Sequence, residues 1–221
     1  MSTSTLRHDC RTGNLARLKK QSSAGAFSDD ASENNQAVQL ASRFGHLDVL
    51  KWLVEESKLT IDFTAVSNWP VQLAAENGHL DVVKWLVKES GQAVDITDHD
   101  NLALQLAAEN GHLDVVKWLV EESGQAVDVT AVSNRAVRWA AGSGHLGVVR
   151  WLVEESGQTV DCRDCETWEL VEDFNNLTED IRAYLLFVKQ LQEMLGLDDW
   201  KTGLELRKTA SRQRLPLTGR I

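Results

Sequence analysis

A period of 33 residues runs through most of the chain and restricts its fold more than any other feature. The triplet Gly-His-Leu recurs at this step, beginning at Gly45, Gly78, Gly111 and Gly144. Tryptophans keep the same step, at Trp52, Trp85, Trp118 and Trp151. Asparagines and aspartates do so too, at Asn35, Asn68, Asn101 and Asn134 and at Asp62, Asp95, Asp128 and Asp161. Such a period is typical of proteins built from stacked repeats, in which each unit contacts only its neighbours.

Each period predicts two short helices. The segment "NLALQLAAENG" begins at Asn101, whose side chain can cap a helix, and ends at Gly111, which can take the left-handed conformation after one. The segment "HLDVVKWLVEES" then places Leu113, Val116 and Val120 at helical spacing. Because the joint is so short, we expect the two helices to be antiparallel, with "GQAVDVTAVS" as an extended loop or hairpin leading to the next pair.

The period, the "LAAENGHLDVVKWLV" core and the order helix, loop, helix, finger together resemble ankyrin repeats. The resemblance implies an all-α solenoid of stacked helix-loop-helix units with short extended fingers. It divides the region 31–162 into four repeats, 31–63, 64–96, 97–129 and 130–162. Outside them we expect an N-terminal capping half-repeat and loop in 1–30, a degenerate C-terminal capping repeat in 163–196 and a basic tail in 197–221.

The start of the first helix departs from the family pattern. The usual Thr-Pro-Leu-His is replaced by Asn-x-Ala-Val or Asn-x-Ala-Leu in most units, so we expect the asparagine to cap the helix instead. The finger also lacks the usual Asp-Gly turn, and the sequence therefore predicts the helices better than the finger geometry.

The repeated joints invite a chemical interpretation, because a row of histidines could hold a metal. The residues concerned are Gly45, His46, Gly78, His79, Gly111, His112, Gly144 and His145. Stacked helical units lie about 8–10 Å apart, whereas zinc needs ligand nitrogens at about 2 Å, so neighbouring rings cannot share one ion. We therefore expect a structural role, with each ring hydrogen-bonded to loop backbone of its own or the neighbouring unit. We predict no metal site and no cofactor.

The repeated tryptophans have two interpretations. They could form an aromatic partner surface along the outer side of the array, because aromatic residues are enriched at interfaces. They could also pack between neighbouring second helices with the indole N–H reaching solvent. We favour packing, because all four repeats contribute the same residue and binding sites are usually irregular.

Positions that break the repeat are therefore the better candidates for partner contacts. In ankyrin arrays the fingers and first helices line a concave groove, and the resemblance implies the same here. Irregular residues expected on these elements are Trp69, His99, Arg135, Arg138 and Trp139. Arginine and tryptophan are common anchors of interfaces. The alternative for Trp139 is that it fills space left by Gly142 and Ser143, where the other units carry larger residues.

The C-terminal segment "TEDIRAYLLFVKQLQEMLG" predicts a helix with an N-terminal Thr-Glu-Asp cap, ending at Gly196. Its apolar face either caps the last repeat, or its far end, with Met194 and Leu195, docks a partner helix. Residues 201–221 hold six basic side chains and one acidic side chain. We expect a mobile tail that contacts the acidic second helices or an acidic partner.

Composition and charge exclude several functional classes. The net charge of −10 argues against general nucleic-acid binding, because phosphates would be repelled. The longest apolar run, "YLLFV", is too short for a membrane span, and the opening lacks a signal-peptide pattern, so we expect neither membrane insertion nor secretion. Three cysteines are too few for a disulfide framework, which favours an intracellular compartment: the cytoplasm, with the nucleus as the alternative.

No nucleophile-base pair, paired catalytic carboxylates or phosphate-binding glycine loop emerges, so we predict that the chain is not an enzyme. We expect a scaffold or adaptor that is monomeric alone and binds one or more proteins. One alternative is a fixed structural subunit of a large multiprotein assembly. Another is a minor metal or redox role for Cys162 and Cys165, although this single CxxC lacks the further ligands of a zinc site.

Overall fold

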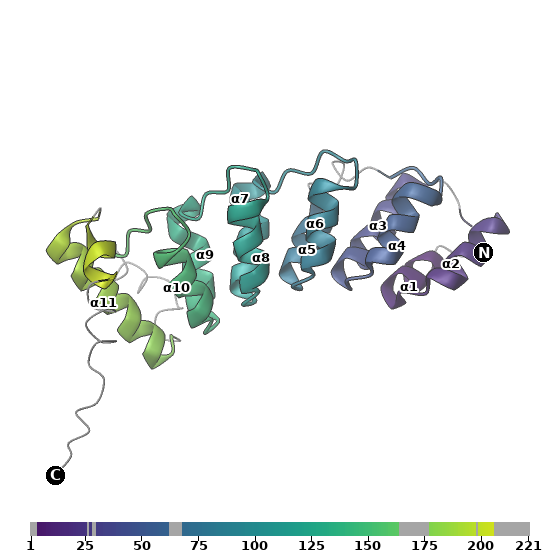
Figure 1. The fold of residues 1–221 in the computed structure, drawn as a ribbon. Helices are drawn as coiled ribbons and strands as arrows, with labels where there is room; N and C mark the ends of the chain where they lie inside the picture. Colours follow the sequence, from purple (N-terminus) through teal and green to yellow (C-terminus); the bar gives the residue numbers. More distant parts are fainter. Residues whose placement is uncertain are drawn as a thin grey trace, which may run out of the picture.

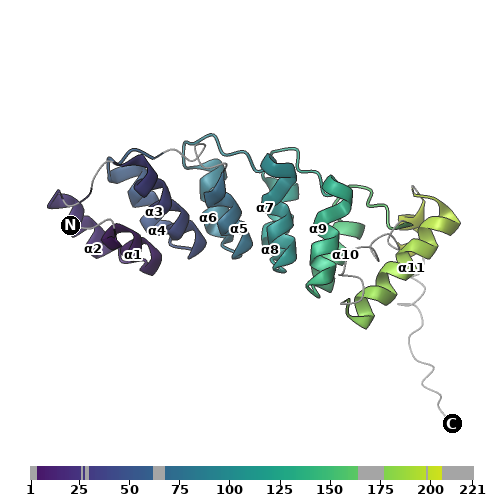
Figure 2. The same ribbon diagram turned by 180° about the vertical axis from the view of Figure 1, so that it is seen from behind.

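The computed structural model describes residues 4–25, 27, 30–61, 68–163, 177–197 and 199–205. It shows pairs of helices set side by side in one curved row, with α1 and α2 at one end and α11 at the other (Figure 1). The loops between successive pairs run along one edge of the row, and the view from behind shows the same order (Figure 2). Each pair thus packs against the pairs before and after it, as in a solenoid.

The first pair consists of α1 (Ser4–Thr12) and α2 (Leu15–Ser23). Four pairs follow, whose first helices are α3 (Ala31–Arg43), α5 (Trp69–Glu76), α7 (Asp98–Glu109) and α9 (Ala131–Gly142). The second helices are α4 (Leu47–Lys51) continued by η1 (Trp52–Glu56), α6 (Leu80–Lys88), α8 (Leu113–Lys117) continued by η3 (Trp118–Glu122), and α10 (Leu146–Glu154). The helix α11 (Glu179–Leu195) comes last, and no residue in the described ranges is in a β-strand. The predicted all-α repeat fold is confirmed.

The first helices lie closer together than the second helices do. Successive members of the series α3, α5, α7 and α9 pack extensively against one another, whereas α6, α8 and α10 share few close contacts. A stack that is tighter on one side curves toward that side. The first helices therefore line the inner side of the curved row, and the second helices line its outer side.

The repeated tryptophans belong to the core. Trp52, Trp85, Trp118 and Trp151 are each at most 4% exposed. They lie among buried valines and leucines of the second helices, such as Val83 and Leu86 in α6. Their burial agrees with the packing interpretation and leaves too little accessible surface for the alternative, an aromatic partner surface.

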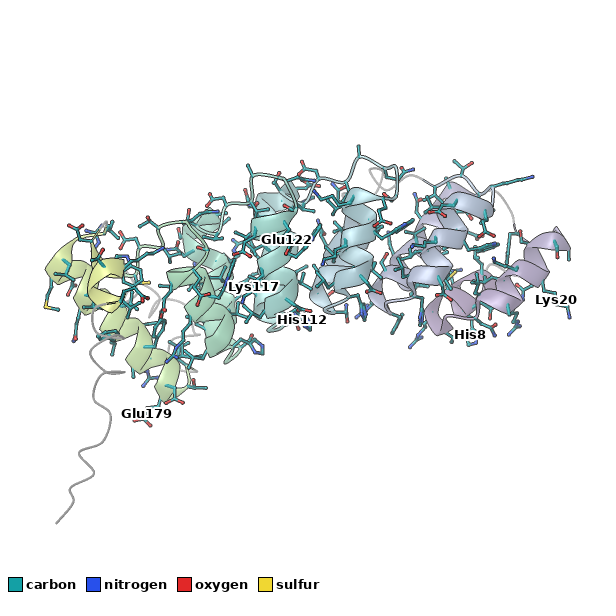
Figure 3. All side chains as sticks on the ribbon, in the orientation of Figure 1. His8, Lys20, His112, Lys117, Glu122 and Glu179 are labelled. Carbon is teal, nitrogen blue, oxygen red and sulfur yellow. The ribbon has the colours of Figure 1, made fainter. Side chains whose placement is uncertain are left out.

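The Gly-His joints lock each pair to the pair before it. Gly45 has a φ of 73°, and an added Cβ would come within 2.6 Å of the His79 ring of the next unit. The same ring lies with Nε2 3.0 Å from the Arg43 carbonyl oxygen, to which Nε2–H donates. Rings at 46 and 112 make the equivalent bond. Figure 3 shows His112 at one end of its second helix and Glu122 at the other, so the joints lie on the edge opposite the inter-repeat loops.

The expectation that asparagines cap the first helices is wrong. Asn68, Asn101 and Asn134 have φ values of 56°, 66° and 59°, which is the left-handed region and not the extended conformation of an N-cap. No side chain caps α5, α7 or α9. Instead, the Asn68 and Asn101 oxygens accept the N–H groups of Asp95 and Asp128, in the loop 27 residues further on, at 3.3 Å. The asparagines therefore join units together.

Glutamines make a second link between units, which the sequence analysis did not predict. The Gln125 amide accepts from Ile96 N–H at 3.0 Å and donates to the Val94 carbonyl oxygen at 2.9 Å. Gln158 binds the backbone of residues 127 and 129 in the same way. The finger loops at 94–96 and 127–129 are thus each bound by a glutamine amide of the next unit, which pairs backbone groups that no β-ladder pairs there.

The helix α11 covers the last full repeat. Its buried residues are Ile181, Tyr184, Leu185, Val188, Leu191 and Gln192. This burial agrees with the capping interpretation, while Met194 and Leu195 at its far end are 71% and 43% exposed. Thr178 stands at the N-cap position but its side chain makes no capping hydrogen bond, contrary to the predicted cap. Gly196 ends the helix with a φ of 81°, as expected.

The tail predicted from residue 197 does not begin there. Residues 200–205 are helical, Trp200 is fully buried and Leu204 is 7% exposed. Two apolar side chains, Trp200 and Leu204, anchor this stretch, although their spacing gave no periodic signal. Several predictions fall outside the described residues: those on Asp62, on Cys165, and on the basic residues after 205.

Candidate partner-binding surface

The first helices expose one face, which forms the inner surface of the row. In α7 the buried apolar residues are Ala103, Leu104, Ala107 and Ala108. Leu102 and Leu106 lie on the opposite side and are half-buried. The 33-residue period continues these two positions across the array. The first-turn row is Gln36, Trp69, Leu102 and Arg135, and the second-turn row is Leu40, Leu73, Leu106 and Trp139.

Trp69 is the most exposed apolar residue of these rows. It is 53% exposed, in contrast to the repeat tryptophans. It begins α5, next to the left-handed Asn68, and Pro70 follows at the first helical turn, where a missing N–H costs nothing. The helix start therefore projects an indole at the loop edge of the inner surface. Exposed aromatic surface of this kind is typical of contact sites.

His99 lies on a turn and not on the inner helix face. His99, Asp100 and Asn101 all have positive φ values, at 51°, 59° and 66°, so these residues at the start of α7 form a left-handed turn that precedes its regular part. The imidazole is half-exposed, with Nδ1 3.1 Å from the Asp98 carboxylate. Non-glycine residues in this region carry strain of about 1 kcal/mol or more each. Such a turn presents His99 to solvent at a fixed angle beside the inner surface.

Arg135, Arg138 and Trp139 form one patch on α9. Arg135 places its guanidinium carbon 5.5 Å from the centre of the Trp139 ring, a cation–π arrangement one helical turn apart. Arg138 lies three residues after Arg135, so its side chain emerges beside theirs. All three are half-buried. The interpretation of Trp139 as a space-filler next to Gly142 stays a prediction.

The five predicted contact residues thus do not form one cluster. The three on α9 are contiguous, and Trp69 stands in the same row as Arg135 with Leu102 between them. His99 lies at the loop edge of the unit between. Together they mark one surface about three units wide, with apolar leucines at its centre.

A separate cleft lies on the outer side, between α10 and the C-terminal helices. It has a volume of about 800 Å³ and is lined by Leu146, Arg150, Glu154, Glu155, Asp180, Ala183, Tyr184, Phe187 and Leu204. The Tyr184 hydroxyl donates to Glu154 at 2.9 Å, and the Arg150 guanidinium lies 5.2 Å from the tyrosine ring. Burial, followed by the charge of Glu154, raises the pKa of Tyr184 well above its usual range. This phenol is therefore a permanent hydrogen-bond donor.

The cleft was not predicted from the sequence. A signal was present, because Gly147 stands where the other units have Asp48, Asp81 and Asp114, and Arg150 stands where they have lysine. These breaks lie on a second helix, whereas the five predicted contact residues lie on the first helices and fingers. The wall supplied by Leu204 could not be located without the fold.

The described ranges contain no group of three or more histidine, cysteine, aspartate or glutamate side chains placed to hold a metal. Cys10 and Cys162 are buried. Burial and then the charge of Asp9 raise the pKa of Cys10 to about 12, so this thiol is not an activated nucleophile. Among the helices that the structure describes, none is long and apolar enough to cross a bilayer.

One family model matches the chain, and its description is "Ankyrin repeats (3 copies)". The matches cover residues 10–100 and 71–164, which together span more than two thirds of the chain. Ankyrin repeats are generally protein–protein interaction modules and are typically non-enzymatic. No curated protein sequence matches the chain.

Proposed function

The chain belongs to the ankyrin-repeat family, and from that membership we propose that it is a scaffold or adaptor that binds a partner protein along the inner surface of its first helices. Binding is non-covalent and needs no catalytic group. The contacts come from the first-turn and second-turn rows, with His99 at the loop edge. The chain acts in an intracellular, cytoplasmic setting, where disulfides are rare, and the free, buried Cys10 thiol supports this.

The exposure of Trp69 is the observation that carries this proposal. An indole that is 53% exposed leaves a large apolar surface in water, which burial against a partner would remove. The half-buried leucines of both rows continue that apolar surface toward Trp139. A rigid array of helices holds these side chains in place before binding, so little ordering entropy is lost on association.

Affinity capture with the full chain from its source cells, followed by mass spectrometry, tests the proposal. Trp69→Ala should lose the captured proteins roughly tenfold or more, as expected for an aromatic anchor. Met194→Ala is the matched control, because Met194 is also exposed but lies on α11 at the far end of the array. Equal capture by the wild type and Trp69→Ala would contradict the proposed surface.

A second candidate function is that of a fixed structural subunit in a multiprotein assembly. Exposed apolar residues on α11 favour it, since Leu186, Met194 and Leu195 are between 38% and 71% exposed. In that case the chain should co-purify in a stoichiometric complex that Met194→Asp disrupts and Trp69→Ala leaves intact. An adaptor should instead purify as a soluble monomer, which sedimentation or size-exclusion chromatography can measure.

A further inference from the structure

Arg135 and Arg138 are two neighbouring cations with no ionic partner among the described residues. No carboxylate lies within ion-pair distance of either, across the part of the chain that the structure describes. Neither side chain donates a hydrogen bond there. Acidic groups outnumber basic ones in this chain, which has a net charge of −10. A half-buried guanidinium that lacks a counterion has hydrogen-bonding capacity to offer.

In the third repeat, the residue equivalent to Arg138 makes a hydrogen bond that Arg138 lacks. Gln105 occupies the equivalent position in α7, is almost fully buried, and donates to the Asp100 carbonyl oxygen at 2.7 Å. It thereby supports the left-handed turn at the start of α7. The fourth repeat has the same turn at Val132–Asn134, with φ values of 52° to 59°. Arg138 nevertheless makes no such bond among the described residues, so its side chain does not support this turn.

The arrangement of the patch fits an anion that arrives with apolar neighbours. The Arg135 guanidinium carbon lies 5.5 Å from the centre of the Trp139 ring, so the ring holds the guanidinium next to Arg138. A guanidinium can donate two parallel N–H groups to a planar carboxylate. Leu106 of the same row supplies an apolar flank. Partial burial excludes some water and strengthens the attraction.

We propose that Arg135 and Arg138 bind an aspartate or glutamate side chain of the partner, while the residues beside it pack on Trp139 and Leu106. This deepens the proposed function and rests on it. The guanidinium N–H groups donate to the carboxylate oxygens. The chain's overall negative charge repels long acidic tracts, so the recognised segment is a short one in which one or two acidic residues stand among apolar ones.

Selection from a random 12-residue peptide display library on the immobilised full chain tests the proposal. Peptides selected on the wild type should be enriched in aspartate or glutamate next to apolar residues. The double variant Arg135→Gln, Arg138→Gln should lose the acidic enrichment and bind wild-type peptides at least about tenfold more weakly. Arg138→Glu should reverse the preference toward lysine and arginine. Arg138→Lys, which keeps the charge, serves if a larger change impairs folding, and should retain part of the acidic enrichment.

The outcomes separate this inference from the function on which it rests. Peptides that bind the wild type, fail to bind Trp69→Ala and show no acidic enrichment would overturn the carboxylate site and leave the binding surface intact. Acidic enrichment that persists in the double glutamine variant would also overturn the site. Peptides that bind Trp69→Ala as well as the wild type would count against the proposed surface itself.

Discussion

Gln192 accepts the backbone N–H of Cys162 at 2.8 Å, and the same amide donates to the carbonyl oxygen of Val160 at 2.8 Å. In earlier units the equivalent link joins a loop glutamine to a residue 29 positions before it, as between Gln158 and Val129. Here the separation is 30, and the glutamine belongs to the helix α11. The helix α11 thus makes the same hydrogen bonds to the preceding unit that a loop glutamine makes in earlier repeats.

Gln192→Ala should lower the free energy of unfolding by about 2 kcal/mol or more, because it leaves two backbone groups of buried residues without partners. Gln190→Ala is the control, since Gln190 lies on the same helix and is exposed. Its effect should stay within about 0.5 kcal/mol. Urea denaturation of both variants measures the difference. Similar losses in the two would mean that the Gln192 amide bonds add no stability.

Gly111→Ala should destabilise the protein more than Gly157→Ala. Both glycines have a φ near 77°, so both alanines carry the same backbone strain of about 1 kcal/mol. An added Cβ at Gly111 would also meet the His145 ring at 2.5 Å, whereas nothing lies within 4 Å at Gly157. Thermal unfolding compares the two. Adding His145→Ala should recover part of the stability lost in Gly111→Ala and none of that lost in Gly157→Ala. Equal losses in the two glycine variants, with no recovery, would show that the contact between Gly111 and the His145 ring does not affect stability.

Trp200→Ala should destabilise the chain by about 3–5 kcal/mol, the usual effect of deleting a large buried aromatic side chain. Trp69→Ala is the matched control, because it removes the same atoms from a position that is 53% exposed, and should change stability by less than about 0.5 kcal/mol. Chemical denaturation monitored by circular dichroism reads both. A small effect at Trp200 would show that residues 200–205 do not belong to the core.

Stability should fall at alkaline pH. An unfolded thiol loses its proton near pH 8.5, whereas burial keeps Cys10 protonated in the folded chain up to about pH 12. The folded state therefore holds more protons in this window. The contribution of Cys10 is complete below pH 8.5 and is lost as the pH rises toward 12, at up to about 1.4 kcal/mol per pH unit. The raised pKa of Tyr184 acts in the same direction above about pH 10.

Urea titrations at pH 8, 9, 10 and 11 measure this dependence. Cys10→Ala should flatten the decline between pH 9 and 10, where Tyr184 contributes least, even though the variant is less stable at every pH. Tyr184→Phe should flatten the decline above pH 10. Parallel curves for the wild type and Cys10→Ala would contradict the assigned protonation of the thiol.

The sequence predicted the repeat, the helix pairs and the glycine joints because each depends on local chemistry that recurs every 33 residues. Gly111 at a positive φ and the buried Trp118 are of this kind. The asparagines were misassigned because asparagine is a suitable residue for both roles: it can cap a helix, and it can hydrogen-bond to the next unit. Only the left-handed backbone of Asn101 distinguishes them.

The candidate surface was predictable in part. The irregular residues Trp69, Arg135 and Trp139 were found as breaks in a strict period, and they lie on the inner face of their helices. The sequence could not predict that Arg138 lacks the hydrogen bond that Gln105 makes one repeat earlier. Predicting that bond requires the position of the Asp100 carbonyl oxygen. The outer cleft depends on Leu204, which is far away in sequence from α10.

His79, His112 and His145 each cover a glycine of the preceding unit that lies 34 residues earlier, as with His79 and Gly45. A unit inserted as a whole block of 33 residues would therefore supply a histidine for the glycine of the unit before it and a glycine for the histidine of the unit after it. The identical segments "NGHLDVVKWLV" at 77–87 and 110–120 make two such blocks nearly interchangeable. The array could thus have grown by duplication, and could be lengthened in the laboratory, without redesign of any interface.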